Sequence, residues 1–299
     1  MTITRELTPK EYKMKDVNLT GLPNFFLAGC QKTASTWLHR CFREHPEIYV
    51  PENDATHYFT MNYHKGLRWY RTKYEDYSGE KAVGDTTPSY IRDFYAPSRI
   101  AEYNRNAKLI FTFRNPIDRA FSHYWHEKKK RKIAFKFSEV LENYDLYENW
   151  IVAGFYYQHL SRYYEYFEKD QILVLIFEDL KENSHSFLKT IFRFLDVDDS
   201  FVPSVIEKKV NVAWLYPRDI NKNDKFILIK DLANRLVVKK FYQRVANKIN
   251  KSFRSIGLSS SEYYDIGISP EMRAKLNDIF HKENQKLSQA IGRDLSHWN

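Results

Sequence analysis

The residues best suited to chemistry lie between Gly29 and Trp37, directly after the apolar run Phe25–Ala28. This run is typical of a buried strand, and Trp37–Arg43 is typical of a helix. A strand, a tight loop with Gly, Lys and Ser/Thr, and a helix N-terminus together form an anion cradle, because backbone N–H groups and the helix dipole point at the anion. Lys32 adds a full positive charge. The sequence therefore predicts a phosphate-binding loop.

The spacing of this loop differs from that of nucleoside triphosphatases, since the pattern Gly-x-x-x-x-Gly-Lys-Ser/Thr is absent. Lys32 lies three residues after Gly29, and Ser35 and Thr36 follow Lys32 by three and four residues. So short a pattern also fits an ordinary strand–helix turn. A second motif is needed to decide between these interpretations.

The second motif is Arg114–Tyr124, which follows the apolar run Lys108–Phe113. Arg114 is a cation at the carboxyl end of a predicted strand. The helix that follows begins near Pro116, a residue type that suits the first helical turn. Ser122 lies about two turns later and can place a hydroxyl on the same side as Arg114. A cation and a hydroxyl at a second anion site imply a ligand with two separated phosphate groups.

Together these motifs resemble those of the sulfotransferases that use 3′-phosphoadenosine 5′-phosphosulfate. The family's 5′-phosphosulfate loop is similar to Gly29–Trp37, with His45-Pro46 ending the following helix, and its 3′-phosphate motif is similar to Arg114–Tyr124. The similarity spans residues 22–298. It includes the segments Gly84–Tyr90, Gly154–Tyr156, Ile172–Leu180 and Ile291–Trp298.

This resemblance implies roles for individual residues. Lys32 would stabilise the leaving phosphate, while N–H groups of residues 33–36 would hold the 5′-phosphate. Arg114 and Ser122 would hold the 3′-phosphate. Trp37 would stack on the adenine or belong to the core, and Tyr156 would shape the adenine side or belong to the core. The residues expected to contact the donor are Gln31, Lys32, Thr33, Ala34, Ser35, Thr36, Trp37, Arg114, Ser122 and Tyr156.

The acceptor side departs from the family pattern. Carbohydrate-type members carry Lys-Glu-x-x-Phe-Phe or a close variant, in which the Glu is taken as the base that removes the acceptor proton. Aligned on Tyr58-Phe59, this chain has Ala55 at the Glu position. Three candidates stand nearby for the role of base: Asp54, His57, whose residue type titrates near neutral pH, and Asp85.

Composition and charge limit the alternatives. The 299 residues carry a formal net charge of +9, which suits an anionic donor and an acidic acceptor. Nucleic-acid binding is not expected, because no zinc-finger, ribonucleoprotein or basic-zipper pattern is present. The histidines lack metal-ligand spacing, so no metal is expected. Two cysteines give no disulfide framework, and no run approaches the about 20 apolar residues of a membrane span. We expect a cytoplasmic protein without a transmembrane segment.

Strand and helix patterns alternate from residue 22 onward, which predicts an α/β fold: a single domain with a central, mostly parallel sheet flanked by helices, of the phosphate-loop (P-loop-like) sulfotransferase architecture. Residues 1–21 are expected to form an N-terminal arm, and 22–299 the sulfotransferase domain. Expected strands are Phe25–Ala28, Lys81–Gly84, Leu109–Phe113 and Ile172–Phe177; expected helices are Ser35–Glu44, Pro97–Asn104, Pro116–Lys130, Phe137–Asn143, Tyr156–Phe167, Ser184–Leu195, Leu236–Phe253 and Pro270–Ile291.

Two basic segments have open interpretations. Leu236–Phe253 is amphipathic and would pack on the domain or lie on a membrane surface. Lys128–Lys132 would be a solvated helix end or a docking point for an acidic saccharide.

The sequence thus predicts a transferase that moves a sulfuryl group from 3′-phosphoadenosine 5′-phosphosulfate to a hydroxyl of a saccharide, glycolipid or small metabolite. One alternative is a protein that binds this nucleotide or its desulfated product without transferase activity, because of Ala55. Another is a nucleotide kinase, which lacks support since no Gly-Lys-Ser/Thr or magnesium carboxylate is evident.

Overall fold

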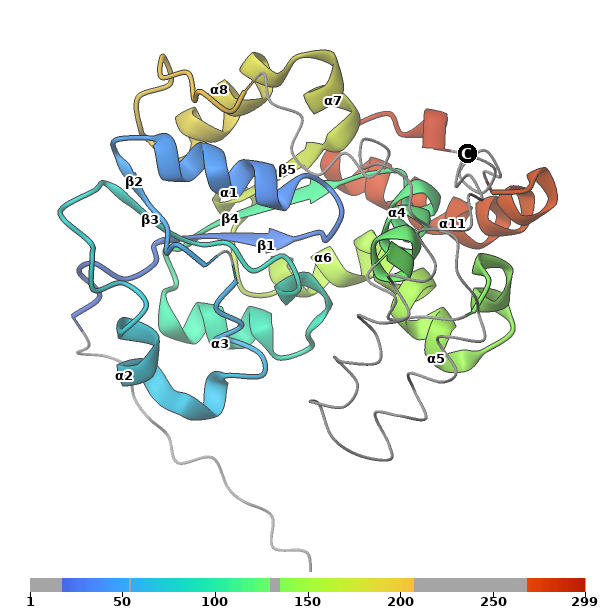
Figure 1. The fold of residues 1–299 in the computed structure, drawn as a ribbon, viewed down its shortest axis with the longest axis horizontal. Coiled ribbons are helices and arrows are strands. Elements are labelled where there is room, and N and C mark those ends of the chain that lie inside the picture. Colours follow the sequence, from blue (N-terminus) through green and yellow to red (C-terminus); the bar gives the residue numbers. More distant parts are fainter. Residues whose placement is uncertain (1–17, 54, 130–134, 207–267, 299) are drawn as a thin grey trace, which may run out of the picture.

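The computed structural model describes residues 18–53, 55–129, 135–206 and 268–298. Its centre is a five-stranded sheet with the order β2-β3-β1-β4-β5, in which every neighbouring pair is parallel (Figure 1). The strands are β1 (Phe25–Gly29), β2 (Ile48–Tyr49), β3 (Ala82–Asp85), β4 (Lys108–Phe113) and β5 (Ile172–Ile176). All five residues of β1 are buried, as expected for a central strand covered on both faces.

The helices of the described part are α1 (Ser35–Glu44), α2 (Gly66–Arg71), α3 (Ala96–Tyr103), α4 (Pro116–Lys129), α5 (Tyr144–Leu146), α6 (Tyr156–Tyr164), α7 (Phe177–Glu182), α8 (Ser184–Phe194) and α11 (Pro270–Ile291). Helices α1 and α8 cover one face of the sheet, while α3 and α6 cover the other (Figure 1). The helical spacing of apolar residues in α1 explains its orientation, since Leu38 and Phe42 share one buried face.

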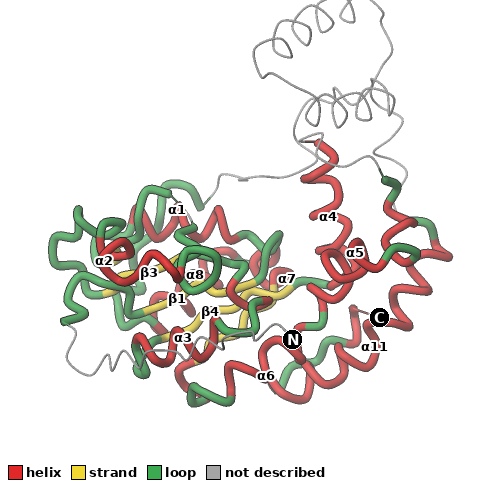
Figure 2. The backbone as a smooth tube through the Cα atoms, turned by 90° about the horizontal axis from the view of Figure 1, so that it is seen from below, coloured by secondary structure: helices red, strands yellow, loops and turns green. Residues whose placement is uncertain are grey.

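A third apolar cluster lies beyond the carboxyl ends of the strands. It joins α4, the short helical turns of residues 137–154 and α11, and its members include Trp125, Trp150 and Phe280. In Figure 2, α4, α5 and α11 stand together at one end of the sheet. Helix α11 has clear end signals, because Ser269 accepts a hydrogen bond from the Met272 N–H at 3.2 Å and Gly292 ends the helix with φ 65°.

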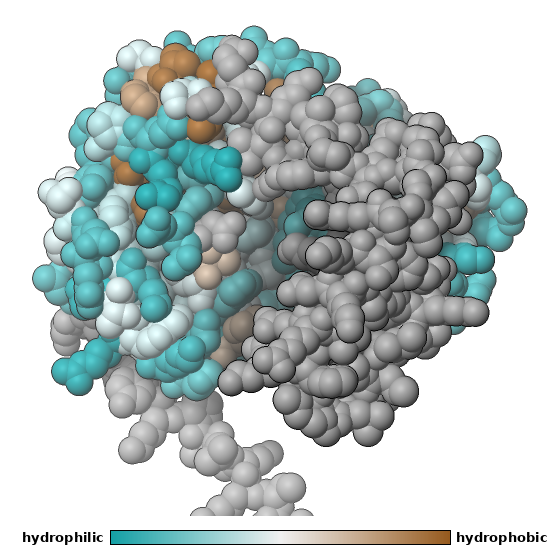
Figure 3. All heavy atoms as spheres, in the orientation of Figure 1, coloured by the Kyte–Doolittle hydropathy of each residue, from teal (hydrophilic) through white to brown (hydrophobic). Residues whose placement is uncertain are grey.

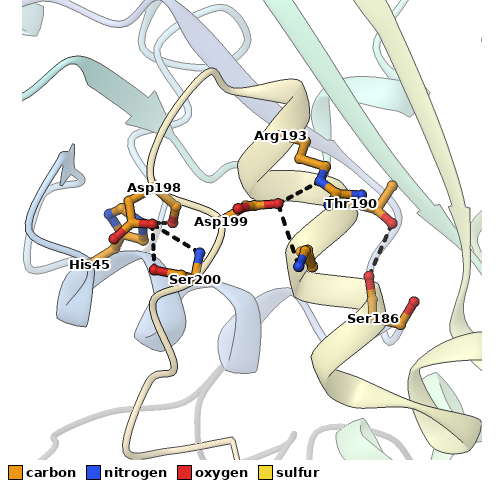
Figure 4. Close-up of polar contacts among 8 residues, drawn as sticks. His45, Ser186, Thr190, Arg193, Asp198, Asp199 and Ser200 are labelled. Atoms are coloured by element: carbon orange, nitrogen blue, oxygen red, sulfur yellow. Dashed lines mark hydrogen bonds and ion pairs between the residues drawn. The ribbon is translucent and has the colours of Figure 1, made fainter.

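The end of α1 is fastened to the segment that follows α8. His45 Nε2 hydrogen-bonds the Asp198 carbonyl oxygen at 2.9 Å (Figure 4). The ring centroids of His45 and Phe192 lie 4.5 Å apart. Asp198 also accepts from Ser200, and Asp199 pairs with Arg193 of α8. In Figure 3, hydrophobic side chains gather near α8 and this segment, where Val202 is 54% exposed, on a face that is otherwise mostly hydrophilic.

These observations confirm the predicted α/β sheet and correct some elements. Strand β2 and helices α2, α5 and α7 were not predicted. Phe137–Asn143, expected as an α-helix, contains the 3₁₀ helix Phe137–Leu141. Residues 1–17 of the predicted arm, the predicted helix 236–253 and residues 130–132 of the basic run lie outside the described residues. Within the described ranges, no helix is both long and apolar enough to cross a bilayer.

Candidate active site

The loop between β1 and α1 has the backbone of an anion cradle. Lys32 and Ala34 have φ angles of 71° and 75°, in the left-handed region. Such conformations in non-glycine residues cost free energy and concentrate at functional sites. Ala34 is the N-cap of α1 and provides no side-chain hydrogen bond to it. The first-turn N–H groups therefore suit an anion as their partner.

Thr33 holds this loop against β4. Its fully buried hydroxyl lies 2.6 Å from the Cys30 carbonyl oxygen, to which it donates, and 2.5 Å from the Thr112 hydroxyl. The Cys30 N–H also donates to the Thr112 carbonyl oxygen at 2.9 Å. The Thr33 side chain thus serves the loop's shape, and only its backbone N–H is suited to contact the donor.

The remaining loop residues separate into two groups. Gln31, Lys32, Ala34, Ser35 and Thr36 are half-buried, as a lined binding surface requires. Trp37 is only 6% exposed, belongs to the core beneath α1, and donates its indole N–H to the Val205 carbonyl oxygen at 3.3 Å. The structure therefore favours the core interpretation of Trp37 over adenine stacking.

Arg114 stands at the carboxyl end of β4, beside β1. Its guanidinium lies 5.0 Å from the Phe177 ring, and its buried Nε has no hydrogen-bond partner among the described residues. The Asn115 side-chain oxygen accepts from the Ile117 and Asp118 N–H groups and so begins α4, which carries the half-buried Ser122. Because β1 and β4 are parallel neighbours, both anion motifs leave the same edge of the sheet, toward α4 in Figure 1.

Tyr156 is a core residue that positions Arg114. Its ring is 1% exposed and stacks on Phe113 at 4.5 Å, and its hydroxyl donates to the Arg114 carbonyl oxygen at 2.9 Å. Burial raises the pKa of this hydroxyl well above its usual range, so it stays a donor. Direct contact with adenine is therefore not supported for Tyr156.

Asp85 is fully buried and surrounded by hydroxyl groups. One carboxylate oxygen accepts from Thr56, Tyr70 and Tyr90 at 2.6, 2.7 and 2.8 Å, and the other accepts from Thr87 at 2.5 Å. Burial and the Asp85 charge raise the pKa values of Tyr70 and Tyr90 well above their usual range, which keeps both phenols protonated as donors. The structure thus does not support proton abstraction by Asp85.

The hydroxyl network around Asp85 fixes the backbone at His57, the second candidate base. The Thr87 hydroxyl oxygen accepts from the N–H groups of Thr56 at 3.1 Å and His57 at 3.3 Å. His57 has a left-handed φ of 50°, is half-buried, and its Nδ1 lies 3.2 Å from the Ser89 hydroxyl oxygen. Asp54, the other candidate base, lies outside the described residues, and the adjacent Ala55 is half-buried.

Cations gather around Arg119, a residue of the Arg114–Tyr124 motif. Arg119 is 1% exposed; it donates to the Trp150 carbonyl oxygen, and its Nε has no partner among the described residues. Burial, and then the charges of Arg119, Lys32 and Arg92, lower the pKa of His123 to about 3. Positive potential therefore accumulates where an anionic donor is expected.

The sequence analysis also missed other residues that hold the elements of the candidate site together. His39 of α1 is buried and its Nδ1 lies 2.8 Å from the Thr86 hydroxyl, which joins the helix to the end of β3. The hydroxyl-bearing partners Thr56, Tyr70 and Thr112 come from distant segments, and no local pattern distinguishes them from ordinary core residues. Among the described residues, no group of three or more His, Cys, Asp or Glu could hold a metal ion.

This arrangement of a phosphate loop on β1 and a cation at the end of β4 is that of a nucleotide-binding α/β protein. The family model described as "Sulfotransferase domain" matches residues 22–289. The chain belongs to the sulfotransferase domain family, as the resemblance predicted.

Several known proteins are similar to it. The mouse "Heparan sulfate glucosamine 3-O-sulfotransferase 3B1" is 29% identical over 180 residues, 58% of this chain and 46% of that protein. The mouse "Bifunctional heparan sulfate N-deacetylase/N-sulfotransferase 4" is 28% identical over 195 residues, 59% of this chain and 22% of that protein. The "Membrane-associated sulfotransferase kil1" of Dictyostelium discoideum is 34% identical over 106 residues, 34% of this chain and 22% of that protein. The chain thus spans less than half the length of these curated relatives.

A solved structure supports the fold. The sulfotransferase from Alicyclobacillus acidocaldarius has a TM-score of 0.66 and 22% identity, and the match covers 92% of this chain and 98% of that one.

Proposed function

We propose that this protein transfers a sulfuryl group from 3′-phosphoadenosine 5′-phosphosulfate to a hydroxyl or amino group of a saccharide. The observation that carries the proposal is the placement of two anion motifs at one sheet edge: the Gly29–Thr36 loop after β1, and Arg114 with Ser122 after β4. The saccharide acceptor is supported by the heparan sulfate enzymes among its relatives.

In this reaction the bond between sulfur and the 5′-phosphate oxygen breaks while a bond between sulfur and the acceptor oxygen or nitrogen forms. The leaving phosphate gains charge, which Lys32 and the N–H groups of the loop would stabilise. The acceptor proton passes to a base, for which we propose His57. The Asp85 network fixes the backbone beside this histidine, and the Ser89 hydroxyl orients its ring.

The alternative, a nucleotide-binding protein without transferase activity, rests on Ala55 at the usual Glu position. It is less favoured, because His57 offers a proton acceptor two residues after Ala55. Cys30 and Cys41 are free and buried, which is compatible with a reducing compartment. We therefore propose a cytoplasmic location.

Calorimetry with two nucleotides tests the donor site. Adenosine 3′,5′-bisphosphate is expected to bind at least about tenfold more tightly than adenosine 5′-monophosphate, since charge-assisted contacts contribute about 1.5–3 kcal/mol. Arg114→Ala should remove most of this difference, whereas Arg193→Ala, which breaks an exposed ion pair, should retain it. Equal affinity of the wild-type protein for both nucleotides would contradict the proposal. Transfer of labelled sulfate to unsulfated heparosan oligosaccharides then tests catalysis.

A further inference from the structure

Near the candidate base, three aromatic rings and two arginines form a continuous row, in which two adjacent rings lie between the two arginines. The Arg99 guanidinium lies 4.2 Å from the Tyr63 ring centroid and 5.1 Å from that of Tyr95. Tyr95 packs against Phe94 with centroids 5.3 Å apart and rings at 88°. The Arg162 guanidinium lies 5.9 Å from the Phe94 ring. We call this set, Tyr63, Arg99, Tyr95, Phe94 and Arg162, the aromatic ladder.

The middle of the ladder is exposed and yet held in place. Phe94 is 70% exposed and Tyr95 is 59% exposed, which is costly for two adjacent large rings unless a partner covers them. The Asp93 carboxylate accepts from the N–H groups of Tyr95 at 2.8 Å and Ala96 at 2.9 Å, and so fixes the backbone at the start of α3. A ring surface fixed in advance loses little entropy when it binds a ligand.

The ladder adjoins the candidate active site through both of its segments. Ser89, which contacts His57, lies five residues before Phe94, and the Tyr63 ring centroid lies 5.7 Å from that of Tyr58, the residue after His57. The turn between Ser89 and Phe94 packs directly on the phosphate loop: a Cβ on Gly29 would meet Ile91 at 2.7 Å. A chain-like acceptor with one unit at His57 can therefore continue onto the ladder.

The chemistry of the ladder suits one kind of chain. Ring faces carry partial negative charge and attract the C–H faces of sugar rings, while a guanidinium binds carboxylates. An exposed pair of rings between two guanidinium groups fits a polymer in which apolar sugar faces are flanked by acid groups. We propose that the aromatic ladder is a docking surface for a uronate-containing saccharide chain, the acceptor of the sulfuryl transfer. This inference rests on the proposed function, and it adds the acceptor's chain length and charge.

Binding and transfer assays with heparosan oligosaccharides of two and eight sugars test the ladder. The double change Phe94→Ala with Tyr95→Ala should raise the Kd and the KM for the eight-sugar chain about tenfold. It should leave the kcat with the two-sugar acceptor and the affinity for adenosine 3′,5′-bisphosphate unchanged. Phe94→Trp should retain chain affinity, whereas Phe94→Leu should not. Phe194→Ala is the control, since Phe194 also has a cation over its ring, that of Lys108.

The outcomes separate the two proposals. If the wild-type protein transfers sulfate to the eight-sugar chain and the double variant has an unchanged KM, the ladder is not a docking surface. An equal loss with both acceptors, or a preference for a neutral eight-unit chitin fragment over heparosan, also contradicts this inference. Tighter, ladder-dependent binding of single-stranded RNA, which likewise stacks on aromatic rings, would assign the surface to nucleic acid instead. Failure of the wild-type protein to bind the bisphosphate would contradict the proposed function itself, whereas calorimetric binding of heparosan tests the ladder independently of turnover.

Discussion

Asp85 is the residue whose structural role differs most from its expected one. A buried carboxylate with four hydroxyl donors is a structural centre, because its removal leaves Thr56, Tyr70 and Tyr90 without their acceptor. Charge-assisted hydrogen bonds of this kind contribute about 1.5–3 kcal/mol. Asp85→Ala should therefore lower the free energy of unfolding in urea by several kcal/mol, on the order of 3 or more. Unchanged stability together with abolished transfer would return Asp85 to a catalytic role.

Lys32 belongs to the residues whose role is electrostatic. If it stabilises the charge that develops on the leaving phosphate, Lys32→Met should lower turnover at saturating donor about a hundredfold, while the Kd for the bisphosphate changes less. Single-turnover sulfate transfer and calorimetry measure the two quantities. Lys275→Met, which removes an exposed partner of Glu271, is the matched control. Near-normal turnover of the saturated Lys32 variant would reduce this lysine to a binding residue.

His57 and Asp54 compete for the role of base. We expect His57→Gln to lower kcat by about a hundredfold or more without loss of nucleotide affinity, because general bases contribute about 10²–10⁴. Asp54→Asn should have the smaller effect. The reverse order in the same assay would assign proton abstraction to Asp54. Activity in both variants would show that neither is the base.

At the scale of elements, the helices that could be predicted from the sequence are those with local signals at their ends and along one face. Helix α1 was predicted at Ser35–Glu44 and α11 at Pro270–Ile291, the observed bounds, because Pro270 and the periodic apolar faces are local. Strand β2 has only two residues, Ile48–Tyr49, too few for a period of two to be visible.

The candidate site likewise contains residues in contiguous motifs and residues that meet only in the folded chain. Lys32 and Arg114 could be proposed from the sequence because the loop and strand-end motifs are contiguous in it. The hydroxyl donors around Asp85 could not be proposed in this way, because Thr56, Tyr70 and Tyr90 come together only when the chain is folded.

The attachment of the phosphate loop to β4 can be tested with an isosteric change. Thr33→Val removes a hydroxyl that contacts the Cys30 carbonyl oxygen and Thr112 while it keeps the side chain's volume. We expect about tenfold weaker bisphosphate binding, since the loop's N–H groups lose their fixed directions. Thr190→Val removes the exposed hydrogen bond to the Ser186 carbonyl oxygen of α8 in Figure 4 and should change neither binding nor fold. Equal calorimetric affinity of the two variants would show that the threonine contact does not shape the loop.

At the scale of the whole molecule, positive charge and burial are combined around the site. The formal net charge is +9, and the charge of buried Arg119 contributes to lowering the pKa values of two histidines, His123 of α4 and His159 of α6. Burial, and then cations that include Arg119, lower the pKa of His123 to about 3. Burial also lowers the pKa of His159 to about 4, against the opposing effect of its hydrogen bond to the Val152 carbonyl oxygen. Both side chains are therefore neutral in the folded protein at pH 5, whereas a histidine in the unfolded chain is largely protonated there.

This difference predicts how stability depends on pH. The unfolded state binds more protons than the folded state between about pH 6.5 and the lowered pKa values, so the free energy of unfolding must fall as the pH falls through that range. We expect a loss of about 2 kcal/mol per histidine between pH 7 and pH 5, measured by urea unfolding at each pH. His123→Asn with His159→Gln should flatten the dependence, even if it lowers stability at pH 7. The exposed His185→Gln should retain the slope. An unchanged slope in the double variant would show that these histidines are not the groups that bind the extra protons on unfolding.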